Sequence, residues 1–481
     1  MFWRGMLGYL PANVVQGVVG LLTLVTFTRL LTPDQYGAYA LGFSLMSLTH
    51  TCLFTWNEAA MARFWAGEDA KGDARAHLAT IYRMWLFALP ALPVAAAVAV
   101  VWPMSGDVRL AVLAGLAAIL PKTLAKLAQE RRRAAGEVAG AVGLDVGQTL
   151  GGFLAGAGLA WIGGGGWAPL LGAAAASAVC LAFVLPKELP RLGDGRFEAA
   201  RARTYAAYGG PVALSLILAL VLSTTDRFLL AAFLDEAAVG VYHAGYSLAN
   251  RTLDVAFIWL GAAGGPALIM ALERGGPAAM RDAAREQAGV MALIALPAAA
   301  GLALVAQPLS ALLVGPALSD GAARITPWIA ASSVCNGVTT YYFSQAFTLG
   351  KRTRRLLAAM AIPAAANVAL NLVLIPRFGL EGAVAATLVS YGLGLGASIG
   401  LGHGPTALPI PWRALAEAML ATAAMAAVVA SLPAWGGLPE LALKATVGAL
   451  VYGAIVWAVD AGGLRSRAGQ ALRMLRGGAA A

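Results

Sequence analysis

The sequence predicts an all-α polytopic membrane protein with fourteen transmembrane helices, and three observations support this prediction. The 481 residues are 59% hydrophobic and only 12% charged, whereas soluble domains carry about 25% charged residues. Apolar runs long enough to cross a bilayer recur along the whole chain. The basic residues gather in the short segments between alternate runs, where the positive-inside rule places them.

Fourteen apolar runs reach the length of about 20 residues that a helix needs to cross the hydrocarbon core. In chain order they are residues 8–30, 37–62, 79–103, 108–128, 138–162, 167–186, 205–233, 239–268, 287–306, 322–349, 356–375, 380–402, 412–432 and 440–460. Each run carries few charged residues, and the connecting segments are short. We therefore expect a helical bundle without a separate soluble domain.

Basic residues set the predicted orientation. With the N-terminus in the cytoplasm, most of the 34 Lys and Arg residues fall in the inner segments. A small minority lies at the outer ends: Arg29, Arg109, Arg227, Arg324, Arg377 and Lys444. One arginine, Arg251, lies within a span. This bias predicts that both termini are cytoplasmic and that the number of spans is even.

Two stretches of the chain repeat one another. Residues 37–45 read GAYALGFSL and residues 240–248 read GVYHAGYSL, with glycines and aromatic residues in register. Transporter folds are often built from such repeats, so we expect two pseudo-symmetric six-helix lobes that leave a seam between them. The expected domains are an N-terminal lobe (1–186), a basic cytoplasmic linker (187–204), a C-terminal lobe (205–402), two further spans (403–460) and a basic cytoplasmic tail (461–481).

Arg251 lies near the middle of the span 239–268, where an arginine costs about 2.5–3.5 kcal/mol on insertion scales. Asn250 precedes it, and Asp254 shares its helix face through i,i+3 spacing. One interpretation is an internal ion pair that fixes two helices. The other is a cavity that uses this cation to bind a diphosphate or an acidic sugar.

Five more polar residues lie at the outer ends of spans or inside them. Arg29 and the pair Asp226 and Arg227 lie near the outer ends of their spans, where they can snorkel to the interface or line a cavity. Asn367 and Asn371, one turn apart, either bond between helices or contact substrate. We retain all five as candidate cavity residues.

The inner end of the second span and the middle of the fifth carry further candidates. Asn57, Glu58 and Arg63 are either ordinary helix-end residues or an inner gate. Asp145 and Gln148 share one face through i,i+3 spacing. Asp145 is a candidate site for a coupling proton or cation.

Several chemistries find no support in the sequence. The Cys and His residues show no metal-ligand spacing, and no Gly-x-x-x-x-Gly-Lys-Ser/Thr phosphate loop is present. The net charge of +10 follows membrane topology rather than a nucleic-acid-binding surface. We expect neither a cofactor nor an enzymatic activity, and no nucleic-acid partner.

Three stretches resemble the polysaccharide-flippase branch of the multidrug/oligosaccharidyl-lipid/polysaccharide (MOP) superfamily. They are TRLLTPDQYGAYAL (28–41), DRFLLAAFLDEAAVGVYHAGYSLANR (226–251) and NLVLIPRFGLEGAVAATLVSY (371–391). The resemblance implies a V-shaped two-lobe bundle in the bacterial inner membrane. It also implies translocation of an undecaprenyl-diphosphate-linked oligosaccharide for surface polysaccharide synthesis, with a polysaccharide polymerase as a candidate partner. A seam or gating role for Asp226 and Arg227 follows from it as well.

Three other functions remain open. A flippase for the lipid-linked peptidoglycan precursor fits the repeat and the charges equally well. A MATE-like multidrug exporter would need carboxylates for cationic drugs, and here arginines outnumber acids at the buried sites. A non-transporting scaffold of a polymer-assembly complex has no use for a cation within the membrane.

Overall fold

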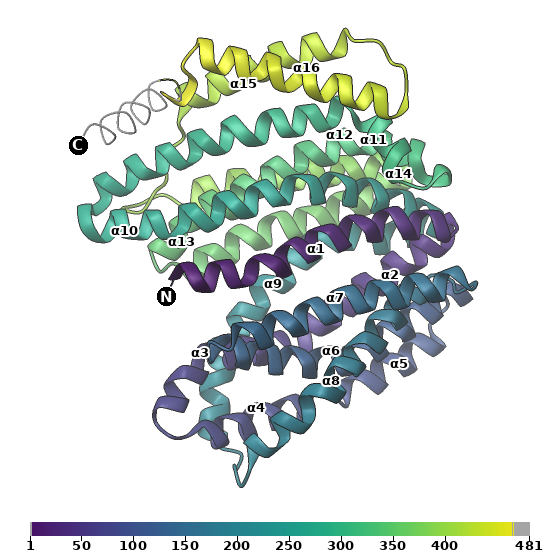
Figure 1. Ribbon diagram of the computed structural model, residues 1–481, viewed down its shortest axis with the longest axis vertical. Helices are drawn as coiled ribbons and strands as arrows, with labels where there is room; N and C mark the ends of the chain where they lie inside the picture. The colour runs from purple at the N-terminus through teal and green to yellow at the C-terminus, as the bar shows by residue number, and fades with distance from the viewer. Residues whose placement is uncertain (1, 464, 466–481) are drawn as a thin grey trace, which may run out of the picture. The chain divides into compact units, whose positions relative to one another are not determined.

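The computed structural model describes residues 2–463 and 465, and every regular element within them is helical (Figure 1). The chain divides into two compact units, residues 1–243 and 244–481. Apart from residues 461–463 and 465, the predicted basic tail lies outside the described residues.

The first unit contains nine helices and the start of a tenth. They are α1 (Phe2–Leu30), α2 (Pro33–Leu53), α3 (Thr55–Ala70), α4 (Ala74–Ala88), α5 (Ala91–Val101), α6 (Gly106–Ala134), α7 (Val138–Trp161), α8 (Ala168–Leu192), α9 (Ala199–Phe233) and the first residues of α10 (Glu236–Leu304). Helices α6, α7 and α8 pack on one another, and α1 packs on α7 (Figure 1).

The second unit contains the rest of α10 and the helices that follow. They are α11 (Ala306–Leu313), α12 (Pro316–Val338), the π-helical turn η1 (Thr339–Phe343), α13 (Gln345–Leu349), α14 (Thr353–Leu401), α15 (Trp412–Ala430), α16 (Gly437–Ala458) and the 3₁₀ turn η2 (Ala461–Gly463). Helix α12 packs on α14, and α15 pairs with α16 as the last helical hairpin (Figure 1).

Ten helical segments among the described residues are long and apolar enough to cross a membrane. Two of them, α10 and α14, each cover two predicted spans. The predicted spans 37–62 and 322–349 fall on helices with an interruption, at Phe54 between α2 and α3 and at η1 after α12. The fold is therefore all-helical and polytopic. The count of fourteen spans and the cytoplasmic termini stay predictions.

Glycines divide the two longest helices. In α10 the backbone of Gly276 has φ 68° and ψ −166°, and in α14 that of Gly379 has φ 57° and ψ −131°. Only glycine adopts such angles without a steric penalty. In α10 the next residue, Pro277, cannot donate a backbone hydrogen bond, which also favours a break there. Each long helix therefore consists of two helical segments joined at its glycine.

Helix α9 belongs to the first compact unit, where it packs on α2 and α3. The sequence places the beginning of the second lobe at residue 205, within this helix. The division into compact units thus does not follow the two sets of six spans, and the lobe boundaries stay predictions.

The beginning of α2 is strongly specified by its sequence. Thr32 is the N-cap and Pro33 follows at the first helical position, where its missing N–H costs nothing. The Thr32 hydroxyl accepts from the backbone N–H of Gln35, whose side-chain oxygen accepts from the Thr32 N–H in return. This capping box fixes the end of α2 that carries the repeated glycine and tyrosines.

Candidate functional site

The two repeated glycines meet where α2 and α10 begin. A Cβ atom on Gly37 would lie 1.8 Å from the carbonyl oxygen of Glu236, and one on Gly240 would lie 2.4 Å from that of Pro33. Real Cβ atoms do not approach backbone this closely, so only glycine permits this crossing. The two copies of the repeat therefore contact each other through equivalent residues within the first unit.

Asp226 and Arg227 lie beside this crossing and are buried. The Asp226 carboxylate accepts from the Tyr242 hydroxyl and, at 2.8 Å, from the backbone N–H of Arg227. The Arg227 guanidinium donates to His243 Nδ1 at 3.3 Å and to the Ser223 carbonyl, and lies 5.9 Å from the centre of the Tyr242 ring. Both charges are thus compensated inside the protein.

Aromatic rings from α2 complete this cluster. The Tyr36 ring centre lies 5.4 Å from that of His243, and the Tyr39 ring lies 6.0 Å from it. Sequence reasoning did not select Tyr36, Tyr242 or His243 as site residues. The repeat contained a usable signal, because it aligns Tyr242 with Tyr39 and places His243 where the first copy has Ala40.

Arg251 is exposed, and it forms no ion pair with any carboxylate among the described residues. The predicted pair with Asp254 is therefore not formed, although Asp254 lies one turn away and is partly buried. The neighbouring Asn250 accepts a 2.5 Å hydrogen bond from Ser333 of α12. Tyr246, one turn earlier, lies 3.1 Å from the Tyr391 hydroxyl of α14. These two contacts hold the helix while leaving the guanidinium available.

Arg29 is also exposed, and it donates to the Val25 carbonyl at 3.0 Å in its own helix. At the other end of the first unit, Asn57 is buried and donates to the Ile81 carbonyl of α4. Glu58 does not contact Arg63; it pairs instead with His50 at 2.7 Å. Arg63 is exposed beside its neighbour Phe64. These three predicted gate residues therefore have separate partners.

Asp145 and Gln148 share a helix face but not a partner. The Asp145 carboxylate accepts from Gln16 at 2.9 Å and from Arg133 at 3.3 Å. Gln148 accepts from Ser177 of α8. The Asp145 charge is thus balanced by an arginine, and its predicted role with a coupling ion stays a prediction.

Asn367 and Asn371 are fully buried in α14 and bond to each other. The Asn371 amide donates to the side-chain oxygen of Asn367 at 3.0 Å and to its carbonyl at 2.9 Å. The remaining polar atoms, Asn367 Nδ2 and Asn371 Oδ1, have no hydrogen-bond partner among the described residues. The expected bond to another helix is therefore not formed.

A buried ion network near the ends of α6 and α8 was not anticipated. The fully buried Arg131 donates to Glu188 at 2.8 Å and to Glu137 at 2.9 and 3.0 Å, and lies 5.5 Å from the Trp65 ring. Arg132 adds a 2.8 Å contact to Glu188. Hydrogen bonds from Arg131 hold the pKa of the Glu137 carboxyl, between α6 and α7, below its usual value. From the sequence alone, both arginines were used only to predict the membrane topology.

A second unanticipated network joins α9 to α3 and α4. Arg201 pairs with Glu68, with Asp73 at 3.1 Å and with Glu198 at 3.0 Å. One turn later the Tyr205 hydroxyl lies 2.5 Å from His77 Nδ1. These contacts explain why α9 belongs to the first compact unit.

No group of three or more His, Cys, Asp or Glu residues that could hold a metal ion is found in the described part of the chain. Arginines, asparagines, carboxylates and tyrosines are prominent among the polar groups of the helices. Such groups can bind anions and form hydrogen bonds to sugars.

Solved structures share this fold. The lipid II flippase MurJ, in its inward closed conformation, aligns with a TM-score of 0.74 at 12% identity, over 93% of this chain and 98% of that one. An inward-facing multidrug resistance MATE family transporter of the MOP superfamily aligns with a TM-score of 0.65 at 16% identity, over 80% of this chain and 93% of that one. An outward-facing MATE family structure aligns with a TM-score of 0.53 at 13% identity, over 87% of this chain and 93% of that one.

The helical arrangement defines a polytopic membrane protein with the fold that the MurJ and MATE structures share. Residues 26–320 match the family model described as polysaccharide biosynthesis protein. The chain belongs to this family, and its fold is shared with a lipid II flippase and with MATE family transporters of the MOP superfamily. No curated protein matches the chain significantly.

Proposed function

We propose that this protein moves an undecaprenyl-diphosphate-linked oligosaccharide from the cytoplasmic to the periplasmic leaflet of the bacterial inner membrane. The family supports a role in polysaccharide biosynthesis, and the fold is that of transporters. The headgroup crosses the membrane inside the protein while the polyprenyl tail stays in the bilayer. Alternating access then exposes the headgroup on the other side.

The observation that carries this proposal is Arg251. It is an exposed arginine in a predicted span, and no described carboxylate pairs with it. Because such a residue is costly in lipid, we assign it the role of binding an anionic ligand. A guanidinium matches phosphate oxygens in a bidentate geometry. The other residues that we predict to line the transport path are Asn250, Asp254, Arg29, Asn57, Glu58, Arg63, Asn367 and Asn371, with Asp226 and Arg227 as candidates for the gate and Asp145 and Gln148 as candidates for the coupling ion.

Replacing Arg251 tests the proposal in a strain that lacks its own polysaccharide flippase. Arg251→Ala should abolish surface polymer while the protein still accumulates in the membrane. Arg251→Lys should restore only part of it, because lysine keeps the charge but loses the bidentate geometry. Arg324→Ala is the matched control, since Arg324 is exposed and makes only a 3.6 Å surface pair with Glu381. Normal polymer from Arg251→Ala would contradict the assignment.

A lipid II substrate is the second candidate, because a protein named as a lipid II flippase shares the fold. The same gene should be expressed in a strain depleted of its lipid II flippase. We expect no rescue of growth there. Rescue of growth without restoration of surface polymer in the first strain would select the peptidoglycan precursor instead.

A further inference from the structure

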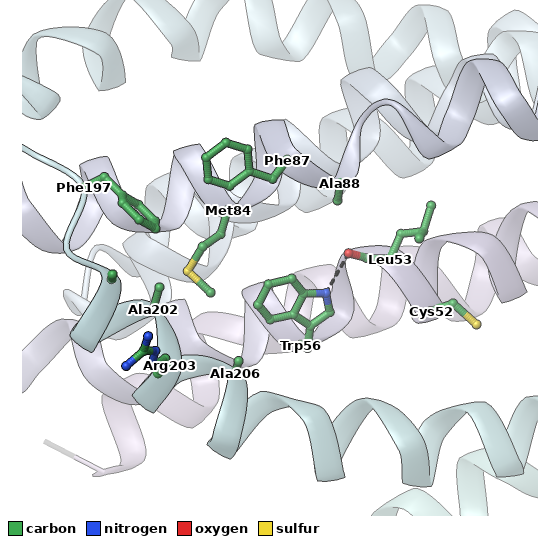
Figure 2. Close-up of a pocket in the computed structure, with 11 residues that line it drawn as sticks. Cys52, Leu53, Trp56, Met84, Phe87, Ala88, Phe197, Ala202, Arg203 and Ala206 are labelled. Carbon is green, nitrogen blue, oxygen red and sulfur yellow. Dashed lines mark hydrogen bonds between the residues drawn. The ribbon is translucent and has the colours of Figure 1, made fainter.

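A groove of about 540 Å³ opens on the first unit between α2, α3, α4 and the beginning of α9. This volume lies in the range of roughly 300–1,000 Å³ that is usual for ligand sites. Its walls are almost entirely apolar and include Trp56, Met84, Phe87 and Phe197 (Figure 2). Phe87 leaves 71% of its surface exposed, so the groove faces the surroundings of the protein rather than its core.

The shape of the groove is held by specific contacts. The Phe197 ring, in the segment between α8 and α9, meets the Phe87 ring edge-on at 5.8 Å. The backbone N–H of Glu198 donates to the Thr80 hydroxyl at 3.2 Å, which anchors this segment on α4. The indole N–H of Trp56 donates to the Leu53 carbonyl at 2.8 Å and fixes that ring (Figure 2). The groove is therefore preformed.

The two ends of the groove differ in polarity. Arg203 lies at the end that also holds Phe197, and Cys52 lies at the opposite end (Figure 2). Arg203 is the one charged residue among those that line the groove, and it makes no ion pair within the described part of the chain. By contrast Arg201, two residues earlier, is bound to three carboxylates.

Two more exposed arginines flank this charged end. Arg83 lies one turn before Phe87 on α4, and Arg196 precedes Phe197. Neither pairs with a carboxylate of the described residues. The predicted topology places this end on the cytoplasmic side, where the surface of the inner leaflet is negative. The groove thus has a cation at the membrane interface and an apolar channel that leads away from it. This arrangement matches the polarity of one lipid molecule.

We propose that this groove binds an anionic phospholipid of the inner leaflet, with its phosphate on Arg203 and one acyl chain along Trp56, Met84 and Phe87. A phosphodiester carries one negative charge, which the single lining guanidinium balances. A polyprenyl diphosphate carries more charge than the one guanidinium that lines the groove balances. Basic pockets between membrane helices on the cytoplasmic side are known to select anionic headgroups. The site is separate from the transported substrate and does not depend on its identity.

Lipid titration of the purified, delipidated full chain tests the proposal, with bound lipids counted by native mass spectrometry. We expect tighter binding of phosphatidylglycerol than of phosphatidylcholine. Arg203→Gln should weaken phosphatidylglycerol binding about fivefold, the factor that one interfacial arginine contributes. It should weaken phosphatidylcholine binding less, because the choline cation already balances the phosphate of that lipid. Arg281→Gln, which removes an exposed arginine of the second unit, is the matched control and should behave like wild type.

Two variants fill the apolar part from opposite walls. Ala206→Phe on α9 and Ala88→Phe at the end of α4 should each weaken the binding of both lipids. Two variants are used because one of them could fail to fold. Size-exclusion chromatography shows which variants are folded. Equal binding of the two lipids by wild type, or an unchanged Arg203→Gln, would overturn the proposal. So would displacement of phosphatidylglycerol by inorganic phosphate alone or preferential binding of a polyprenyl diphosphate.

Discussion

Arg131 and Arg251 lie in the same apolar chain but have opposite surroundings. Arg131 is enclosed by two carboxylates and an indole ring, whereas Arg251 is exposed and has no ion-pair partner among the described residues. Desolvation makes a buried charge costly unless it is paired. Arg131 therefore stabilises the fold, and Arg251 is available to a ligand.

This contrast predicts different effects on stability. Arg131→Ala leaves Glu188 buried without its main partner, so we expect a loss of about 3–5 kcal/mol, as for other broken buried pairs. Arg251→Ala should change stability little. Arg413→Ala is the control, because the Arg413 side chain is 92% exposed and a surface i,i+4 pair is worth about 0.3–0.5 kcal/mol. Thermal unfolding in detergent measures all three; an Arg131→Ala protein as stable as wild type would contradict the structural role.

Sequence reasoning at the residue scale found polar residues but not their partners. It identified Asp226 and Arg227 as a pair, and the two are buried together. It paired Arg251 with Asp254 from their spacing, and no such pair forms. The i,i+3 spacing only permits contact, while tertiary packing decides it. Arg131 and Glu188 are 57 residues apart, and no local pattern reports a contact over that distance.

At the scale of elements, hydrophobic runs located the helices well. The predicted runs fall on helices, because crossing a membrane requires continuous internal hydrogen bonding. The interruptions were harder to predict. The break at Phe54 has neither Pro nor Gly beside it, and neither residue occurs within the π turn η1 (Thr339–Phe343). By contrast, the Gly-Gly-Pro sequence at 275–277 is a readable signal for the break in α10.

The crossing of α2 and α10 gives a prediction at this scale. Gly37→Ala and Gly240→Ala each add a Cβ where backbone oxygen already lies at 1.8 and 2.4 Å. Overpacking of this kind typically costs about 1–3 kcal/mol. Gly17→Ala in α1 is the control, since nothing lies within 4 Å of its added Cβ, and alanine favours a helix. Melting temperatures in detergent decide the question: if all three variants melt alike, the glycine crossing does not form.

At the scale of the whole molecule, composition and charge distribution predicted the class of fold. An all-helical polytopic fold follows from long apolar runs, because lipid tolerates little else. The compact units were not predicted. Repeated sequence suggested a boundary before residue 205, but α9 is bound to the first unit through Arg201 and Tyr205. A repeat shows how a chain is built, whereas side-chain contacts decide how it packs.

The predicted orientation has a direct test. If both termini are cytoplasmic and the chain crosses fourteen times, residues 163–166 face the periplasm and residues 403–411 face the cytoplasm, because basic residues favour the inner side. Alkaline phosphatase is active only in the periplasm. Green fluorescent protein fluoresces in the cytoplasm but not after export by the general secretory route. A phosphatase fusion after Gly165 should be active, and a fluorescent fusion after Pro405 should be bright. Swapping the two reporters should silence both.

An active phosphatase after Pro405 would mean that the spans before it are odd in number or that the N-terminus is outside. A phosphatase fusion to residue 2 would separate these two cases.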